Sequence, residues 1–113
     1  MNAKNIYRLF FPFVLLMIFN LAYAQSKKLI NEDSCSVNGI LLYGKIKFVE
    51  SFPDLTVQVV ESFPDLKVKI VNSFPDHCGE WQIVDSFPDV KVKIVESFAD
   101  IKIKFVESYP GIP

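Results

Sequence analysis

The chain has 113 residues, half of them hydrophobic, and its 12 basic and 13 acidic side chains give a formal net charge of −1. A chain of this length forms one small domain, near the size at which a hydrophobic core alone is marginal. Because lysines and carboxylates alternate along the chain and do not cluster, the charge pattern argues against a nucleic-acid partner.

Residues 1–24 have the layout of a secretory signal peptide. Basic residues precede an apolar run over residues 9–21, and Ala22-Tyr23-Ala24 supplies the small residues of a cleavage site. A membrane anchor is the alternative, but the run is shorter than the ~20 residues of a spanning helix, and Asn20 interrupts its end. We therefore expect residues 25–113 to form one exported unit, periplasmic or secreted, without stable membrane insertion.

Residues 25–44 form a segment that precedes the repeats. Its Asn38-Gly39 pair lies between Val37 and a short apolar run, which is the signal for a two-residue hairpin turn. We expect a short hairpin here.

The chain has two cysteines, Cys35 in this segment and Cys78 further along. An even number of cysteines in an exported chain favours a disulfide. Two free thiols are the alternative, because a disulfide also requires the two Cα atoms to lie close together.

A unit of eleven residues recurs six times in residues 45–113, with the pattern Lys-apolar-Lys-apolar-Val-acidic-Ser-aromatic-Pro-Asp-apolar. Successive serines of the unit are 11, 11, 13, 11 and 11 residues apart: Ser51, Ser62, Ser73, Ser86, Ser97 and Ser108. Repeats of this regularity mean that one small structural unit is used six times.

The first part of each unit predicts a β-strand of about six residues. In residues 66–70, three apolar residues alternate with Lys67 and Lys69, which is the period of a half-buried strand. Val71 follows on the lysine side, so either both faces are partly covered there or a bulge changes the facing. The outward lysines also discourage pairing between sheet edges.

The second part of each unit predicts a tight turn. Phe74 precedes a proline and is expected to be extended, while Pro75 and Asp76 suit the two central positions of the turn. Between the third and fourth units the chain is two residues longer, over residues 77–81, which predicts a wider loop. The whole is an all-β single domain of six strand-turn repeats.

These repeats resemble the 7(1) septoil knot domain family. The resemblance rests on the Val-acidic-Ser-aromatic turn, the Lys/apolar strands and the single Cys78-Gly79-x-Trp81 interruption, and it covers roughly residues 35–113. It implies a small all-β domain whose backbone is wound into a deep 7(1) torus knot, and it implies no settled biochemical activity.

Five aspartates of the turns are candidate metal ligands. If the turns stack, their carboxylates form a ladder that suits calcium, which prefers several oxygen ligands. No Gly-rich Asp-x-Asp loop is present, so we expect these side chains to bond the local backbone and expect no cofactor. They are Asp54, Asp65, Asp76, Asp89 and Asp100.

Six aromatic side chains of the turns are the second candidate set. If exposed, they would offer a platform for a glycan, but we expect them to pack over the strand ends and close the core. They are Phe52, Phe63, Phe74, Phe87, Phe98 and Tyr109.

The sequence contains no recognisable catalytic set. His77 beside Cys78 is the only adjacent base and nucleophile, but neighbours on an extended chain point apart, and the chain has one histidine. The repeated serines lie in no Gly-x-Ser-x-Gly elbow.

We therefore expect a non-enzymatic structural or interaction protein with a partner in the bacterial envelope or outside the cell. A calcium- or glycan-binding module is the alternative. A fibre subunit is a third possibility, which the lysines and the prolines in almost every turn oppose.

Overall fold

The computed structural model describes residues 30–113, so the predicted signal peptide lies outside the described residues. The described part contains nine β-strands and no helix, and therefore no helix that is long and apolar enough to cross a membrane. The all-β prediction is confirmed. The strands are β1 Ile30–Asn31, β2 Ser36–Val37, β3 Ile40–Leu41, β4 Gly44–Phe48, β5 Leu55–Val59, β6 Leu66–Ile70, β7 Glu80–Ile83, β8 Val90–Ile94 and β9 Ile101–Phe105.

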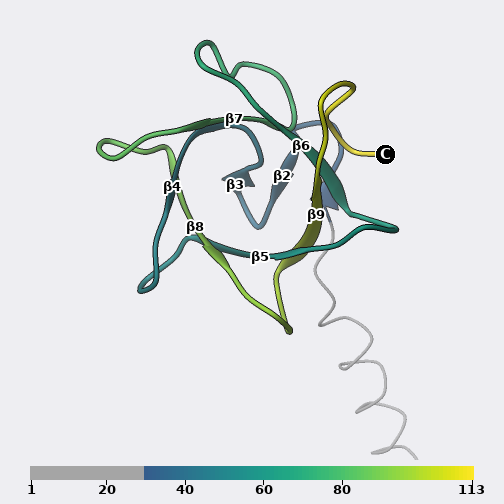
Figure 1. The fold of residues 1–113 in the computed structure, drawn as a ribbon, viewed down its shortest axis with the longest axis horizontal. Coiled ribbons are helices and arrows are strands. Elements are labelled where there is room, and N and C mark those ends of the chain that lie inside the picture. The colour runs from purple at the N-terminus through teal and green to yellow at the C-terminus, as the bar shows by residue number, and fades with distance from the viewer. Residues whose placement is uncertain (1–29) are drawn as a thin grey trace, which may run out of the picture.

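The six strands of the repeats close into a barrel in which every pairing is parallel (Figure 1). The order around the barrel is β4-β7-β6-β9-β5-β8. The chain thus makes two circuits: β4, β5 and β6 take alternate places, and β7, β8 and β9 fill the places between them. A closed barrel leaves none of these strands with a free edge, which removes the template that the fibre alternative requires.

A strong stagger between strands makes these parallel pairings compatible with short connections. Phe48 ends β4 and Leu55 begins β5, yet both lie opposite Val92 of the intervening strand. Val59 and Leu66 lie opposite Ile103 in the same way. Four of the five connections between barrel strands therefore span only two strand spacings, about 10 Å, and the fifth joins the neighbouring strands β6 and β7. Six residues suffice, whereas unstaggered parallel strands need a crossover of about a dozen.

The segment that follows each strand projects outward as an arm (Figure 1). Six residues reach about 20 Å when extended, roughly twice the gap to be crossed, so the excess length turns back on itself away from the barrel. The arms are residues 49–54, 60–65, 71–79, 84–89, 95–100 and 106–110.

The turn of each arm lies earlier in the sequence than predicted. Phe74 has φ of 53°, in the left-handed region, so the expectation of an extended residue before proline is wrong. The placement of Pro and Asp at the centre of the turn is also wrong for the arms whose aspartate pairs with a neighbouring strand, as the first arm shows. The N–H of Asp54 donates to the carbonyl oxygen of Lys91 at 2.8 Å. The aspartate already pairs with a neighbouring strand, so the chain must reverse before it.

The interior of the barrel is built from alternate strand residues, as the period-two pattern predicts. The first and third residues of β5, Leu55 and Val57, are buried, while Thr56 and Gln58 between them are partly exposed. The valine that follows each strand is half-buried, and its N–H continues the ladder, as from Val49 to Val92. No bulge is needed there, so the partly covered alternative is the one observed.

The N-terminal segment closes one end of the barrel. Its strands β1, β2 and β3 form an antiparallel sheet, hereafter the plug, and β2 and β3 lie inside the outline of the barrel (Figure 1). Asn38 and Gly39 both have positive φ, as the predicted two-residue hairpin requires. The plug runs directly into β4, and the carbonyl of Leu42 accepts a bond from Gly79, just before β7. It therefore covers the end at which the strands begin.

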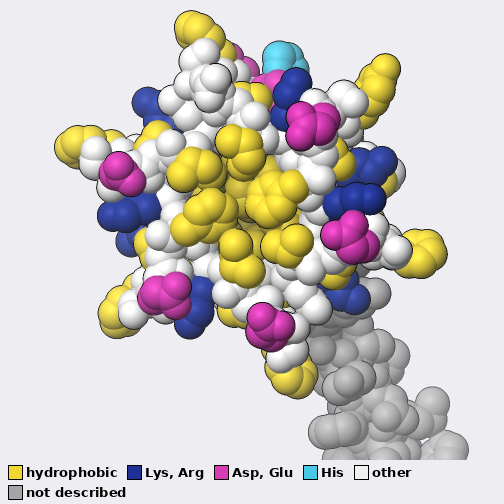
Figure 2. All heavy atoms as spheres, in the orientation of Figure 1, with side chains coloured by type: hydrophobic (Ala, Val, Ile, Leu, Met, Phe, Trp, Pro, Cys, Tyr) yellow, Lys and Arg dark blue, Asp and Glu magenta, His cyan; other side chains and the backbone are white. Residues whose placement is uncertain are grey.

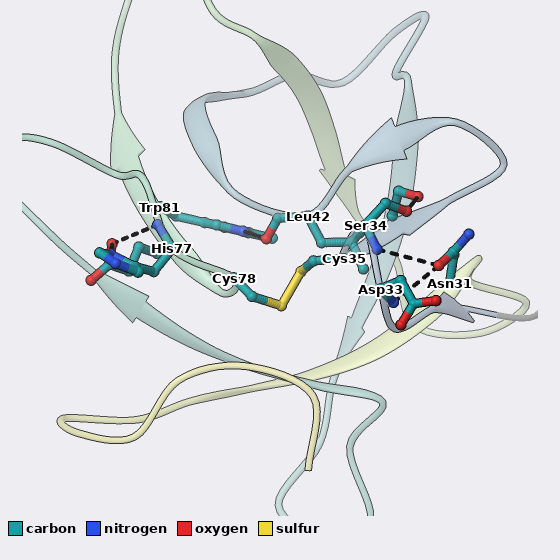
Figure 3. Close-up of a disulfide and its surroundings, with 10 residues drawn as sticks. Asn31, Asp33, Ser34, Cys35, Leu42, His77, Cys78 and Trp81 are labelled. Atoms are coloured by element: carbon teal, nitrogen blue, oxygen red, sulfur yellow. Dashed lines mark hydrogen bonds and ion pairs between the residues drawn. A yellow bond between two sulfur atoms is a disulfide. The ribbon is translucent and has the colours of Figure 1, made fainter.

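Two contacts fasten the plug to the barrel (Figure 3). The disulfide between Cys35 and Cys78, with 5.8 Å between the Cα atoms, confirms the predicted pairing. The indole N–H of the fully buried Trp81 donates to the carbonyl of Leu42 at 3.1 Å. Together with the bond from Gly79, these contacts hold the plug and the residue that follows it against the start of β7.

Removal of the disulfide is expected to lower the free energy of unfolding by about 4 kcal/mol. The closed loop spans 43 residues, and without it the unfolded chain gains conformational freedom. Urea unfolding of Cys35→Ser/Cys78→Ser, followed by the fluorescence of Trp81, measures the loss. Wild-type protein under reducing conditions is the control and should unfold at the same urea concentration. Equal midpoints for the oxidised protein and the variant would contradict the prediction.

Candidate functional site

The aromatic residues of the arms, hereafter the arm tips, are strongly exposed. Their side chains are 81–100% accessible to solvent, and Figure 2 shows apolar side chains at the ends of the projecting arms. The expectation that they close the core is wrong, because the barrel is filled by its own strand residues and the arms point away from it. The arm tips are Phe52, Phe63, Phe74, Phe87, Phe98 and Tyr109.

The backbone of every arm tip is unusual in the same way. All six residues have φ between 53° and 57°, in the left-handed region, where a bulky side chain costs about 1–3 kcal/mol. Glycine adopts this conformation without the steric cost. The folding of the arm therefore does not explain why an aromatic ring stands at this position.

The arm tips do not converge on one cavity. The arms radiate from the barrel in different directions, so each ring is a separate small surface (Figures 1 and 2). The single platform considered from the sequence is not assembled. What the arrangement offers is six similar apolar contacts spaced around one rigid body.

The aspartates of the arms bond a neighbouring strand. Asp54 Oδ2 accepts from the N–H of Lys91 at 2.9 Å, and the N–H of Asp54 donates to the carbonyl of the same lysine. The same two-point contact joins Asp65 to Lys102, Asp89 to Lys45 and Asp100 to Thr56. These contacts reach 37 or 44 residues along the sequence, so the expectation of local bonds is wrong for these four.

Asp76 is the exception, because it lies in the longer arm. Its N–H donates to the carbonyl of Phe74, two residues earlier, at 2.9 Å. The radiating arms keep the aspartates apart, and residues 30–113 contain no group of three His, Cys, Asp or Glu side chains that could hold a metal ion.

The adjacent His77 and Cys78 do not form a catalytic pair in this structure. The sulfur of Cys78 is bonded to Cys35, and the side chain of His77 is exposed, with its Nδ1 3.2 Å from a carboxylate oxygen of Glu80. That oxygen also accepts the backbone N–H of His77 at 3.0 Å. This loop is thus closed by Glu80.

The pKa of Glu80 is lowered, chiefly by the backbone N–H of His77 and also by the side-chain bond and charge of that residue, while burial opposes the shift. Because this pKa is lowered in the folded state, the ionised carboxylate of Glu80 stabilises the folded chain at neutral pH. This stabilisation is lost as the pH falls through the lowered pKa, because the carboxylate is then protonated.

Sequence reasoning missed the role of Gly79. Its φ is 83°, and a side chain there would collide with the carbonyl oxygen of Lys67 and the backbone nitrogen of Gly111. Lys67 and Gly111 exchange two backbone hydrogen bonds of 2.8 Å, which tie the C-terminal segment to β6. The only sequence signal was the glycine itself, in the one unit that is longer than the others.

A comparison with protein families agrees with the repeat architecture. The model of the 7(1) septoil knot domain matches residues 39–113, which include all six barrel strands. The chain belongs to the 7(1) septoil knot domain family. The resemblance inferred from the repeats is therefore confirmed.

This septoil knot domain is also similar to the uncharacterized protein slr1025 of Synechocystis sp. The two are 68% identical over 56 residues, which is 50% of each chain. The alignment thus spans about half the length of that curated relative.

Loss of one aspartate contact should weaken the septoil knot domain. In Asp54→Ala the N–H of Lys91 loses its carboxylate acceptor, and we expect a loss of about 1 kcal/mol in the free energy of unfolding. Urea unfolding measures it. Glu50→Ala in the same arm is the matched control, because no described contact joins this exposed side chain to a neighbouring strand. Equal losses of unfolding free energy in the two variants would show that the contact between Asp54 and Lys91 does not stabilise the fold.

Calcium should not stabilise the septoil knot domain. Four of the five aspartates already accept backbone N–H groups and lie on separate arms. Thermal melts in excess calcium and in excess chelator are therefore expected to coincide. A ligand that binds only the folded state raises its stability, so a clear increase in Tm with calcium would overturn this assignment.

Proposed function

We propose that this septoil knot domain is an exported, non-enzymatic scaffold that uses its arm tips as six similar binding sites. The observation that carries the proposal is the pairing of strong exposure with left-handed backbone at all six rings. Both features carry a free-energy cost, and neither stabilises the barrel. An aromatic ring on an exposed arm supplies a flat apolar face for a partner.

The arrangement favours a partner that is itself repetitive. One exposed ring gives a weak contact, but rigidly linked contacts raise the overall affinity when the partner offers several sites within reach. A polysaccharide of the cell envelope or its surroundings is such a partner, since each sugar unit presents an apolar ring face. This choice develops the glycan-binding alternative, with separate arm tips in place of one platform.

Three observations support export and a non-enzymatic role. The disulfide suits an oxidising compartment. The candidate nucleophile Cys78 is consumed by that disulfide. Four of the five arm aspartates lie on separate arms, and their carboxylates accept backbone N–H groups of neighbouring strands.

The knot that the family description names is part of the proposal. A knotted and disulfide-bonded backbone would slow unfolding, which benefits a protein that is exposed to proteases. The aspartate contacts at the base of four arms favour fixed positions of these arms relative to one another, as multivalent binding requires.

Successive removal of the rings tests the proposal. Variants with one, two, four and all six arm tips replaced by alanine are mixed with insoluble peptidoglycan, chitin and cellulose, and the bound fraction is measured by sedimentation. Wild-type protein is expected to bind at least one polymer, and affinity should fall with each ring, by about 100-fold or more when all six are absent.

The matched control replaces Ser51 and its five equivalents by alanine in the same arms, and circular dichroism verifies folding. Wild-type protein that binds none of the polymers would refute the polysaccharide partner. Full binding by the variant without rings would refute the role of the arm tips.

A further inference from the structure

The second end of the barrel is open and apolar. The last residues of the six strands, hereafter the mouth, form a ring at the end opposite the plug, because all six strands are parallel. Their side chains have the inward facing of the core residues, yet they are 38–50% exposed. Figure 2 shows a continuous apolar patch at the centre of this face. The mouth consists of Phe48, Val59, Ile70, Ile83, Ile94 and Phe105.

The mouth is also indented. A depression of about 230 Å³ lies at the ends of β6 and β9 and is lined by Val68, Lys69, Ile70, Phe105, Val106 and Glu107. A space of this size admits an apolar side chain. The two ends of the barrel therefore differ: one is sealed by the plug and a disulfide, and the other presents an apolar surface with a recess.

A ring of acidic side chains surrounds the mouth. The second residue after each strand is acidic in five of the six arms and is an asparagine, Asn72, in the remaining one. Figure 2 shows acidic side chains spaced around the apolar centre, with basic side chains beside them. These exposed acidic residues, hereafter the rim, are Glu50, Glu61, Asp85, Glu96 and Glu107.

The negative charge of the rim favours some kinds of partner for the apolar mouth and disfavours others. A second copy docked mouth to mouth would bring two acidic rims together, and like charges across an interface oppose association. An anionic membrane surface would be repelled in the same way. A basic partner instead gains attraction from the rim while its apolar side chains cover the mouth.

We propose that the mouth docks a basic amphipathic segment of a partner protein. Apolar side chains of that segment cover the mouth and enter the recess beside Ile70 and Phe105, and its lysines or arginines lie against the rim carboxylates. Amphipathic segments commonly dock in this way, through apolar anchors that fit a hydrophobic groove. This surface is separate from the arm tips and does not depend on the function proposed for them.

The protein contains its own reporter for this interaction. Trp81 is its one tryptophan, and its ring centre lies 6.3 Å from that of Phe48 and 6.4 Å from that of Phe105, both in the mouth. A ligand without aromatic residues that displaces these rings will change the fluorescence of Trp81.

The experiment titrates the purified, oxidised protein with a synthetic leucine–lysine amphipathic peptide and with a leucine–glutamate peptide of the same apolar pattern. We expect a saturable change in Trp81 fluorescence with the basic peptide only. Ile94→Gln in the mouth should weaken binding at least tenfold. Glu50→Gln/Glu96→Gln in the rim should weaken it and reduce its dependence on salt, because rim charges act through long-range attraction.

Phe87→Ala at an arm tip is the matched control and should bind like wild type. The rim variant alters only exposed side chains, so it keeps the test valid if Ile94→Gln does not fold. Equal binding of both peptides, or unchanged binding by the folded mouth and rim variants, would overturn the proposal. Self-association that Ile94→Gln abolishes would assign the mouth to a second copy, and binding to neutral lipid vesicles in place of the peptide would assign it to a membrane.

Discussion

The stagger between neighbouring parallel strands is the constraint on which the barrel, the arms and the mouth depend. Because Phe48 and Leu55 lie opposite the same residue, Val92, the chain passes from one strand to the next without running back along the barrel. The residues saved in this way form the arms. The aspartate contacts hold the stagger, since each fixes the residue before a strand to one residue of a neighbouring strand through two hydrogen bonds.

Trp81 relates the two ends of the barrel to each other. Its indole N–H bonds the carbonyl of Leu42 in the segment that follows the plug, and its ring contacts Phe48 and Phe105 at the mouth. One buried side chain therefore spans the interior between a sealed end and an open end. The longer repeat, which also carries Cys78 and Gly79, contains the one tryptophan of the chain. The specialised contacts of the fold are gathered in one of six otherwise similar units.

Local patterns predicted the local features of this fold. The alternation of apolar residues and lysines located the strands and their buried faces, and Asn38-Gly39 located the hairpin. Features set by distant parts of the chain could not be predicted. Near-identical repeats do not reveal the order in which they pair, so the partner of Asp54, 37 residues away, was not foreseen. Nor did alternation distinguish the buried Val57 from the exposed Val59. Both face inward, but Val59 lies at the end of the barrel that the plug does not cover.

The interleaved order of the strands has a consequence for the timing of folding. Every lateral pair in the barrel joins one of β4, β5 and β6 to one of β7, β8 and β9. A nascent chain that ends before β7 therefore contains three barrel strands and none of their native partners, so the backbone donors and acceptors of these three strands stay bonded to water. Assembly of the barrel cannot begin from the N-terminal half alone, as it does where domains fold during synthesis. The three barrel strands of the first half therefore remain unpaired until the second half has been synthesised.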